Sequence, residues 1–128
     1  MKYATHTIIL LVSLLLAGTA LAQSELEELQ HTSPQQRANA QTAFMKQKLN
    51  LTSEQEPKVA AINLKYAKEI DPILKGPEGE FRKALQIRRL EDEKENELKG
   101  VLTPGQFQTF LASKEQLRQK VLEAARAH

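Results

Sequence analysis

The sequence predicts an all-α protein built from long helices that pack against one another. Apolar residues recur at spacings of three and four, which places them on one face of a helix, and no stretch alternates as a strand would. Gly and Pro fall at the ends of these segments. The pattern Leu-Thr-x-x-Gln also occurs twice, at residues 51–55 and 102–106. Its Thr and Gln have the spacing of a capping box, which marks the start of a helix.

Residues 1–22 have the layout of a secretory signal peptide. Lys2 supplies a positive charge, residues 8–18 form an apolar run, and Ala20 and Ala22 supply the small residues that a signal peptidase reads. The apolar run is short for a membrane span. We therefore expect cleavage after Ala22 and no stable membrane insertion afterwards. An uncleaved N-terminal anchor is the alternative.

Cleavage would leave residues 23–128, which form one small domain by length. The chain has no Cys, so no disulfide stabilises it. Without Lys2, 17 of the 18 basic residues remain against 16 acidic ones, so net charge gives no argument for nucleic acid as a partner. Aromatic residues are 5% of the chain, which predicts a thin core that pairing with a second copy would enlarge.

The sequence predicts a flexible leader at residues 23–33. One helical domain with four helices follows at residues 34–128. The first helix runs from Pro34 or Gln35 to Leu49. The second starts at Thr52, and Asp71-Pro72 should bend or end it. If it runs to Leu74, it is about 33 Å long at ~1.5 Å per residue. Its apolar stripe is Val59, Ile62, Tyr66, Ile70 and Ile73.

A turn at residues 75–79 separates these helices from a third at Glu80–Lys99. The last helix is expected from Pro104 to Ala125 as one continuous element. Pro104 falls at its first position, where the missing N–H costs nothing. Leu102 and Phe107 have the spacing of a hydrophobic staple.

The repeated pattern has a structural explanation in its own chemistry. Thr52 and Thr103 would each accept a hydrogen bond from the backbone three residues later, and Gln55 and Gln106 would reach back to the cap. Each cap should stabilise its helix by about 1 kcal/mol. Leu51 precedes the first cap as Leu102 precedes the second.

With a signal peptide, an all-helical mature chain and two such copies, the sequence resembles the Spy/CpxP family of bacterial periplasmic proteins. Six residues carry the resemblance: Leu51, Thr52, Gln55, Leu102, Thr103 and Gln106. The resemblance implies a periplasmic location and a thin, curved homodimer of helical hairpins. The stretch before the first copy departs from well-known members, because it is rich in Gln and Ala rather than Arg and Met.

The resemblance also implies a function. Members are ATP-independent chaperones that hold unfolded proteins, envelope-stress regulators, or metal-responsive proteins. We expect a holdase-type chaperone for unfolded or partly folded envelope proteins that requires no cofactor. An adaptor that docks on one sensor protein is the alternative, and a metal-responsive protein is the weaker third.

The third helix carries the residues that could contact a client. Basic side chains that speed encounter lie beside apolar ones that would hold an unfolded segment. An ordinary solvated helix face with internal ion pairs is the alternative interpretation. The candidate residues are Phe81, Arg82, Lys83, Leu85, Arg88 and Arg89.

The sequence gives no support for catalysis or metal binding. The only histidines after residue 22 are His31 and His128, so no pair has the spacing of a metal site. Ser24, Ser33, Ser53 and Ser113 lie in unremarkable contexts, and the helical domain holds no internal His that could act as a base. No Gly-rich loop could hold a phosphate. We therefore expect a protein that is not an enzyme and has no catalytic or metal-binding residues.

Overall fold

The computed structural model describes residues 25–127, so the expected signal peptide at 1–22 lies outside the described residues. Within this range the chain is helical and contains no strand. The prediction of an all-α protein is confirmed.

The helix α2 spans Pro34–Leu49 and begins with a complete capping box. The Ser33 hydroxyl accepts a hydrogen bond from the Gln36 N–H, and the Gln36 side chain accepts one from the Ser33 N–H. Asn50 ends the helix in the left-handed conformation, with φ of 51°. Asn is one of the few residues that adopt this conformation at low cost, which explains the sharp stop.

The helix α3 spans Gln55–Lys75 and α4 spans Glu80–Lys99. Asp71-Pro72 was predicted to bend or end the second helix, and α3 does not end there but continues through Pro72 to Lys75. Pro72 lies on the exposed side of the helix, while Ile70 and Leu74 on either side of it are buried. Burial of these neighbours offsets the hydrogen bond that proline does not make.

The last predicted helix is two helices. The helix α5 spans Pro104–Ala112 and α6 spans Lys114–Arg126, with Ser113 between them. The Ser113 hydroxyl donates a 2.6 Å hydrogen bond to the Thr109 carbonyl oxygen, an interaction that often bends helices. Ser113 is buried with φ of −104° and ψ of 5°. The break redirects α6 so that Leu117 and Val121 reach the core.

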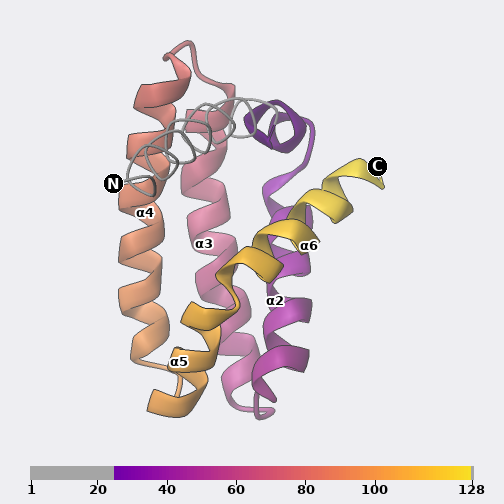
Figure 1. Ribbon diagram of the computed structural model, residues 1–128, viewed down its shortest axis with the longest axis vertical. Helices are drawn as coiled ribbons and strands as arrows, with labels where there is room; N and C mark the ends of the chain where they lie inside the picture. The colour runs from indigo at the N-terminus through magenta and orange to yellow at the C-terminus, as the bar shows by residue number, and fades with distance from the viewer. Residues whose placement is uncertain (1–24, 128) are drawn as a thin grey trace, which may run out of the picture.

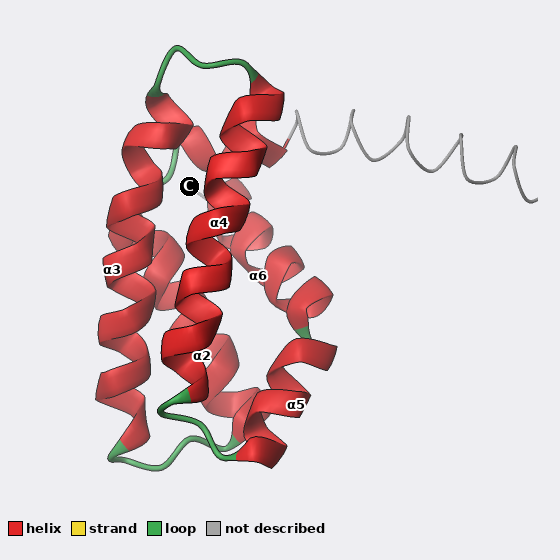
Figure 2. Ribbon diagram, turned by 90° about the vertical axis from the view of Figure 1, so that its left-hand side faces the viewer, coloured by secondary structure: helices red, strands yellow, loops and turns green. Residues whose placement is uncertain are grey.

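The helices form two layers. In Figure 1, α4, α3 and α2 lie side by side, and α5 and α6 cross in front of them. The view in Figure 2 agrees, with α5 and α6 on one side of the other three. The helix α6 packs mainly on α2 and makes fewer contacts with α3 and α4. As a result, α4 has α3 along one side and little cover along the other.

The core lies where these two layers meet. It extends to the α2–α3 and α4–α5 connections, which carry the two Leu-Thr-x-x-Gln copies. Met45, Val59 and Leu98 are essentially inaccessible to solvent. Leu102 belongs to the same cluster, and Phe107 and Leu51 pack against it. The predicted staple between Leu102 and Phe107 thus lies within one apolar cluster. The rest of the cluster comprises Leu49, Phe110, Leu117 and Val121.

The leader differs from the flexible segment expected at residues 23–33. Residues 25–30 are helical, and Thr32 is buried. Gln30 donates a 2.7 Å hydrogen bond to the Leu74 carbonyl oxygen, and Arg126 pairs with Glu28 at 3.2 Å. The side chain of Leu29 packs against the core. These tertiary contacts order a segment too short to form a stable helix alone.

Candidate functional site

The two Leu-Thr-x-x-Gln copies form the same local structure. In the first copy, the Thr52 hydroxyl accepts from the Gln55 N–H, and Gln55 Oε1 accepts from the Thr52 N–H, both at 3.1 Å. In the second copy, Thr103 and Gln106 make the equivalent bonds at 3.2 and 3.0 Å. The second copy caps α5 directly. The first forms an extra turn, so α3 begins at Gln55 instead of directly after Thr52.

The structure brings the two copies into contact through their glutamines. Gln55 Nε2 donates to Gln106 Oε1 at 2.7 Å, and Gln106 Nε2 donates to Gln55 Oε1 at 3.0 Å. The second proton of each amide goes to the other copy's turn. Gln55 binds the Val101 carbonyl oxygen and Gln106 binds that of Leu49, each at 3.2 Å. We call Gln55 and Gln106 the glutamine pair.

Every donor and acceptor of the glutamine pair is used. Each Oε1 accepts two hydrogen bonds and each Nε2 donates two, which is the full capacity of a primary amide. Rotating either amide by 180° would place an NH2 group against a backbone N–H. A saturated, neutral pair of this kind holds the α2–α3 and α4–α5 connections together and leaves no group free for a ligand.

A second feature is an exposed surface on α4. Phe81 is 79% exposed and Leu85 is 53% exposed, and they lie on one face because they are four residues apart. Arg82, Arg88 and Arg89 are also exposed. We call these five residues the α4 patch.

The ion pairs of the α4 patch are weak. Arg82 pairs with Glu78 and Arg89 with Glu93, each at 3.4 Å and with at least 70% of the arginine side chain exposed. Surface pairs of this kind contribute about 0–1 kcal/mol. The guanidinium groups are therefore available to other partners at little cost.

Lys83 does not belong to the α4 patch, so its prediction as a client-binding residue is wrong. It is only 7% exposed. Its Nζ donates a 3.0 Å hydrogen bond to the carbonyl oxygen of Leu74, in the last turn of α3. A cation at this end of a helix satisfies a free carbonyl and complements the helix dipole. Its role is to fix the connection between α3 and α4.

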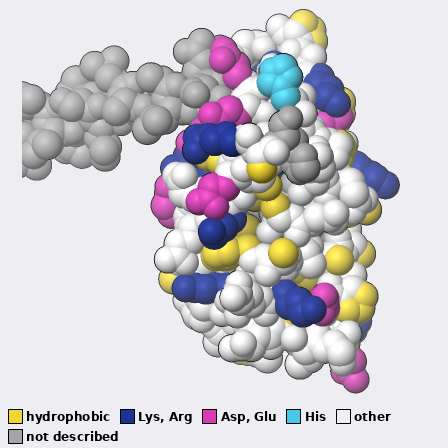
Figure 3. Space-filling view, turned by 90° about the vertical axis from the view of Figure 1, so that its right-hand side faces the viewer, with side chains coloured by type: hydrophobic (Ala, Val, Ile, Leu, Met, Phe, Trp, Pro, Cys, Tyr) yellow, Lys and Arg dark blue, Asp and Glu magenta, His cyan; other side chains and the backbone are white. Residues whose placement is uncertain are grey.

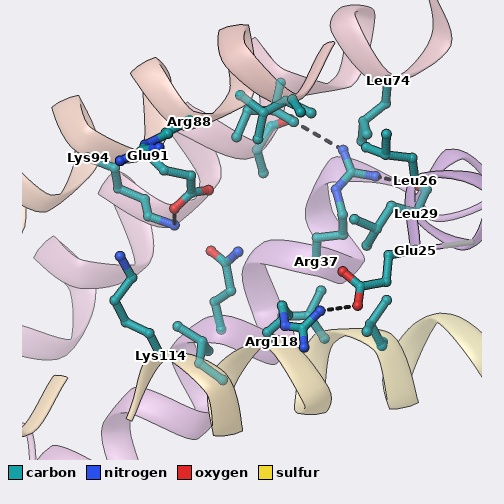
Figure 4. Close-up of a pocket in the computed structure, with 18 of the residues that line it drawn as sticks. Glu25, Leu26, Leu29, Arg37, Leu74, Arg88, Glu91, Lys94, Lys114 and Arg118 are labelled. Atoms are coloured by element: carbon teal, nitrogen blue, oxygen red, sulfur yellow. Dashed lines mark hydrogen bonds and ion pairs between the residues drawn. The ribbon is translucent and has the colours of Figure 1, made fainter. Parts of the chain in front are cut away.

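A cavity of about 520 Å³ lies between α4 and α6 (Figure 4). Its apolar lining comes from every layer of the fold, including the leader. Charged side chains stand among these apolar groups, and most of them are paired. Lys94 is 2.7 Å from Glu91, and Arg118 pairs with Glu25. The main apolar residues are Leu26, Leu29, Ile70, Ile87, Leu117 and Val121.

Arg37 joins the leader to α2 and α3 at one side of this cavity. Its guanidinium donates to the carbonyl oxygens of Thr32 and Ala67 at 2.7 and 3.3 Å, and to Asp71 Oδ1 at 2.9 Å. Burial alone would raise the pKa of the Asp71 carboxyl, but hydrogen bonds from Lys75 and Arg37 hold that pKa below its ordinary value. The buried arginine is therefore matched by an ionised carboxylate.

The charged groups at the opposite wall are equally fixed. Hydrogen bonds from Arg118 to Glu115 and Glu25 raise the pKa of the Arg118 guanidinium.

Within residues 25–127, no three His, Asp or Glu side chains converge as a metal site would require. No helix in the same range is long and apolar enough to cross a membrane.

Sequence reasoning missed two of these features for different reasons. Ser33 and Gln36 form a third capping box. Its sequence, Ser-Pro-Gln-Gln, has the same spacing of hydroxyl residue, Pro and Gln as residues 103–106. Arg37 and Asp71 carry no local signal, because they are 34 residues apart and meet only when α2 packs on α3.

Comparison with known families finds a match that covers most of the chain. A family model described as a domain of unknown function, DUF4890, matches residues 22–110, which are 89 of the 128 residues. The chain belongs to the DUF4890 family. Both copies of the repeated pattern, the glutamine pair and the α4 patch fall within the DUF4890 match, whereas α6 lies beyond it. No curated protein and no solved structure matches the chain.

Proposed function

We propose that the protein is a periplasmic, ATP-independent chaperone of the holdase type that binds unfolded or partly folded envelope proteins. The α4 patch is the observation that carries this proposal. Phe81 and Leu85 expose large apolar side chains that most soluble domains would bury, and arginines flank them.

The patch suits transient contact with unfolded chains. Arginines speed the approach of acidic segments, and their effect falls as salt screens the charge. The exposed Phe81 and Leu85 then bury apolar groups of the client, at about 25 cal/mol for each Å² removed from water. No step in this mechanism requires a nucleotide, a metal or a catalytic group.

The resemblance to the Spy/CpxP family supports the same proposal. It rests on the two Leu-Thr-x-x-Gln copies, on the signal-peptide layout of residues 1–22, and on a helical chain. We extend the proposal to cleavage after Ala22, periplasmic location, and an antiparallel homodimer of helical hairpins. The sparse cover on the outer side of α4 favours a partner there.

Suppression of aggregation by the purified protein, without ATP, tests the proposal. Reduced α-lactalbumin and thermally unfolded malate dehydrogenase are suitable clients, with light scattering as the signal. Leu85→Ser should weaken client binding about tenfold, the effect of removing about 1.4 kcal/mol of apolar contact. Phe81→Ser should weaken it at least as much.

Leu111→Ser is the matched control, since Leu111 is 37% exposed on α5 and lies outside the α4 patch. It should leave protection unchanged. The proposal is wrong if the unaltered protein fails to suppress aggregation at several-fold excess, or if Leu111→Ser and Leu85→Ser have equal effects.

A regulatory adaptor is the second candidate, and the one-sided position of the patch favours it. A single apolar and basic face also suits docking on one acidic receptor domain. Crosslinking in cells distinguishes the two functions. One dominant crosslinked partner indicates an adaptor, whereas many partners indicate a chaperone.

A further inference from the structure

The cavity between α4 and α6 shares only Arg88 with the α4 patch. Ile87 lines the cavity, whereas Phe81 and Leu85 are exposed and do not line it. Its volume of about 520 Å³ falls within the ~300–1,000 Å³ typical of small-molecule sites. A cavity of this size accommodates one long alkyl chain, but not a folded partner.

The walls are suited to an alkyl chain. Leu117 and Val121 of α6 face Ile70 of α3, and Ile87 and Leu29 complete the lining. Leu117, Val121 and Ile70 are each 8% exposed, so they are fixed in the core while still contacting the cavity. A site lined by aliphatic side chains from several elements gains affinity from each methylene buried, about 0.8 kcal/mol per group.

One cation on the cavity wall is left without a counter-charge. Five basic and three acidic side chains line the cavity, and the carboxylates of Asp71 and Glu95, which pair with Arg37 and Lys114, balance the total. Four of the basic groups are paired with carboxylates, including Arg37 with Asp71 and Lys94 with Glu91. Arg88 makes no ion pair or hydrogen bond with the described residues, and Figure 4 shows it beside Glu91 on α4. Its guanidinium is the cation left for an external carboxylate.

A polar group inside the cavity points to a ligand with a polar head. Gln41 lines the cavity, and its Oε1 is buried without a hydrogen-bond partner among residues 25–127. The unpartnered oxygen only accepts a hydrogen bond, so a carboxylate would have to bind the Nε2 of the same amide, while a ligand hydroxyl could donate to the oxygen.

We propose that this cavity binds a single-chain anionic amphiphile, of the class of a long-chain fatty acid. The alkyl chain lies between α4 and α6, and the carboxylate pairs with Arg88 at the rim. This inference does not depend on the chaperone proposal, because Phe81 and Leu85 do not line the cavity; Arg88 is the one residue of the α4 patch that does.

The test is displacement of a fluorescent fatty acid from the purified protein by dodecanoate, below the concentration at which dodecanoate forms micelles. Dodecanoate should bind saturably. Dodecyltrimethylammonium, with the same chain and the opposite charge, should bind about fivefold more weakly, since one ion pair contributes about 1 kcal/mol. Ile87→Trp fills the cavity and should reduce binding at least tenfold.

Arg88→Glu isolates the charge. It should weaken dodecanoate about fivefold and remove the preference for the anion. Lys68→Glu is the matched control, because it makes the same change in net charge at an exposed position of α3 that does not line the cavity. Arg88 is exposed, so its replacement leaves the fold intact, which circular dichroism checks.

Four results would overturn the proposal. Dodecanoate fails to bind, or both amphiphiles bind equally, or Arg88→Glu and Lys68→Glu weaken binding equally. The fourth is that the protein binds phosphatidylglycerol vesicles but not monomeric dodecanoate, which would assign the site to a membrane surface. Loss of aggregation suppression in Leu85→Ser with dodecanoate binding unchanged would confirm that the two sites are separate.

Discussion

At the scale of single residues, the glutamine pair explains why the same five-residue pattern occurs twice. Each Gln closes its own capping box and also binds the other's amide. A repeat whose only role were to start helices would need no such partner. The pattern therefore specifies both the helix starts and the contact between two distant turns.

A double-mutant cycle measures this contact. Gln55→Ala and Gln106→Ala should each lower the free energy of unfolding by about 1–3 kcal/mol, because each leaves a partner amide unpaired in a half-buried site. The double variant should lose less than the sum, with a coupling of about 1 kcal/mol. Urea denaturation measures all four proteins.

Gln36→Ala is the control for this cycle, since Gln36 closes a capping box without a second glutamine. It should cost no more than about 1 kcal/mol and show no coupling to Gln106→Ala. Additive effects of the Gln55 and Gln106 substitutions would show that the pair contributes nothing beyond its two caps.

Asp71 makes stability depend on pH. Its folded-state pKa is lowered, so its contribution is complete above the ordinary value near pH 4 and is lost as the pH falls through the folded-state pKa. Asp71→Asn should lower the free energy of unfolding by about 2 kcal/mol at pH 7, because Arg37 loses its counter-charge. The difference should be smaller at pH 3 than at pH 7, because Asp71 gains a proton as the pH falls through the folded-state pKa.

Thermal unfolding at both pH values checks this prediction, with Asp92→Asn as the control. Asp92 is exposed on α4 and makes no ion pair with the described residues. Its replacement should change stability by less than about 0.5 kcal/mol. An Asp71→Asn protein that stays equally destabilised at low pH would contradict the assigned role of the charge.

At the scale of elements, the two helix irregularities show tertiary packing overriding local preference. Pro72 lies inside α3, and the Ser113 break separates α5 from α6. Local chemistry predicts a bend or an end at Pro72 and a continuous helix through Ser113. Burial of Leu74 after Pro72, and of Leu117 after Ser113, accounts for both outcomes.

Pro72→Ala should therefore stabilise the protein. It restores the backbone N–H inside α3 and removes a residue that costs up to about 3 kcal/mol in a helix interior, so a gain of about 1 kcal/mol or more is expected. Pro104→Ala is the control, since Pro104 is the first residue of α5 and its N–H has no place in the helix ladder. Urea denaturation should show little change for Pro104→Ala. Equal gains at both positions would indicate an unfolded-state effect instead.

At the scale of the whole molecule, charged and apolar side chains are interspersed on the face formed by α2 and α6 (Figure 3).

The leader is part of the packed fold. Arg37 donates to the carbonyl oxygens of Leu29 and Thr32, so a buried cation depends on the chain before α2. The leader also forms part of the cavity wall through Leu26.

A chain that begins at Ser33 should be less stable than one that begins at Gln23. It loses the carbonyl partners of Arg37 and the packing of Leu29, which together contribute about 3 kcal/mol. Urea denaturation measures the difference. Glu27→Ala, at an exposed position of the same segment, should have no effect. Equal stability of the long and short chains would show that the leader only rests on the surface.

Much of this fold follows from local chemistry and could be predicted from sequence. Capping residues, Pro and Gly predicted several helix ends correctly. These are the starts of α2, α4 and α5 and the end of α2. The apolar stripe of α3 is buried at Val59, Tyr66 and Ile70, as its spacing of three and four predicts. Phe81 and Leu85 were named from sequence as candidate client contacts, but their exposure is known only from the structure. Lys83 was misplaced because charge alone does not reveal a carbonyl partner on another helix.

The sequence by itself determined that the chain is helical and where most helices begin, because capping and periodicity act over a few residues. Only the tertiary structure decided that Gln55 meets Gln106, that Arg37 meets Asp71, and that a cavity lies between α4 and α6. The two side-chain pairs join residues 51 and 34 positions apart. Their geometry depends on how whole helices pack, which no short stretch of sequence encodes.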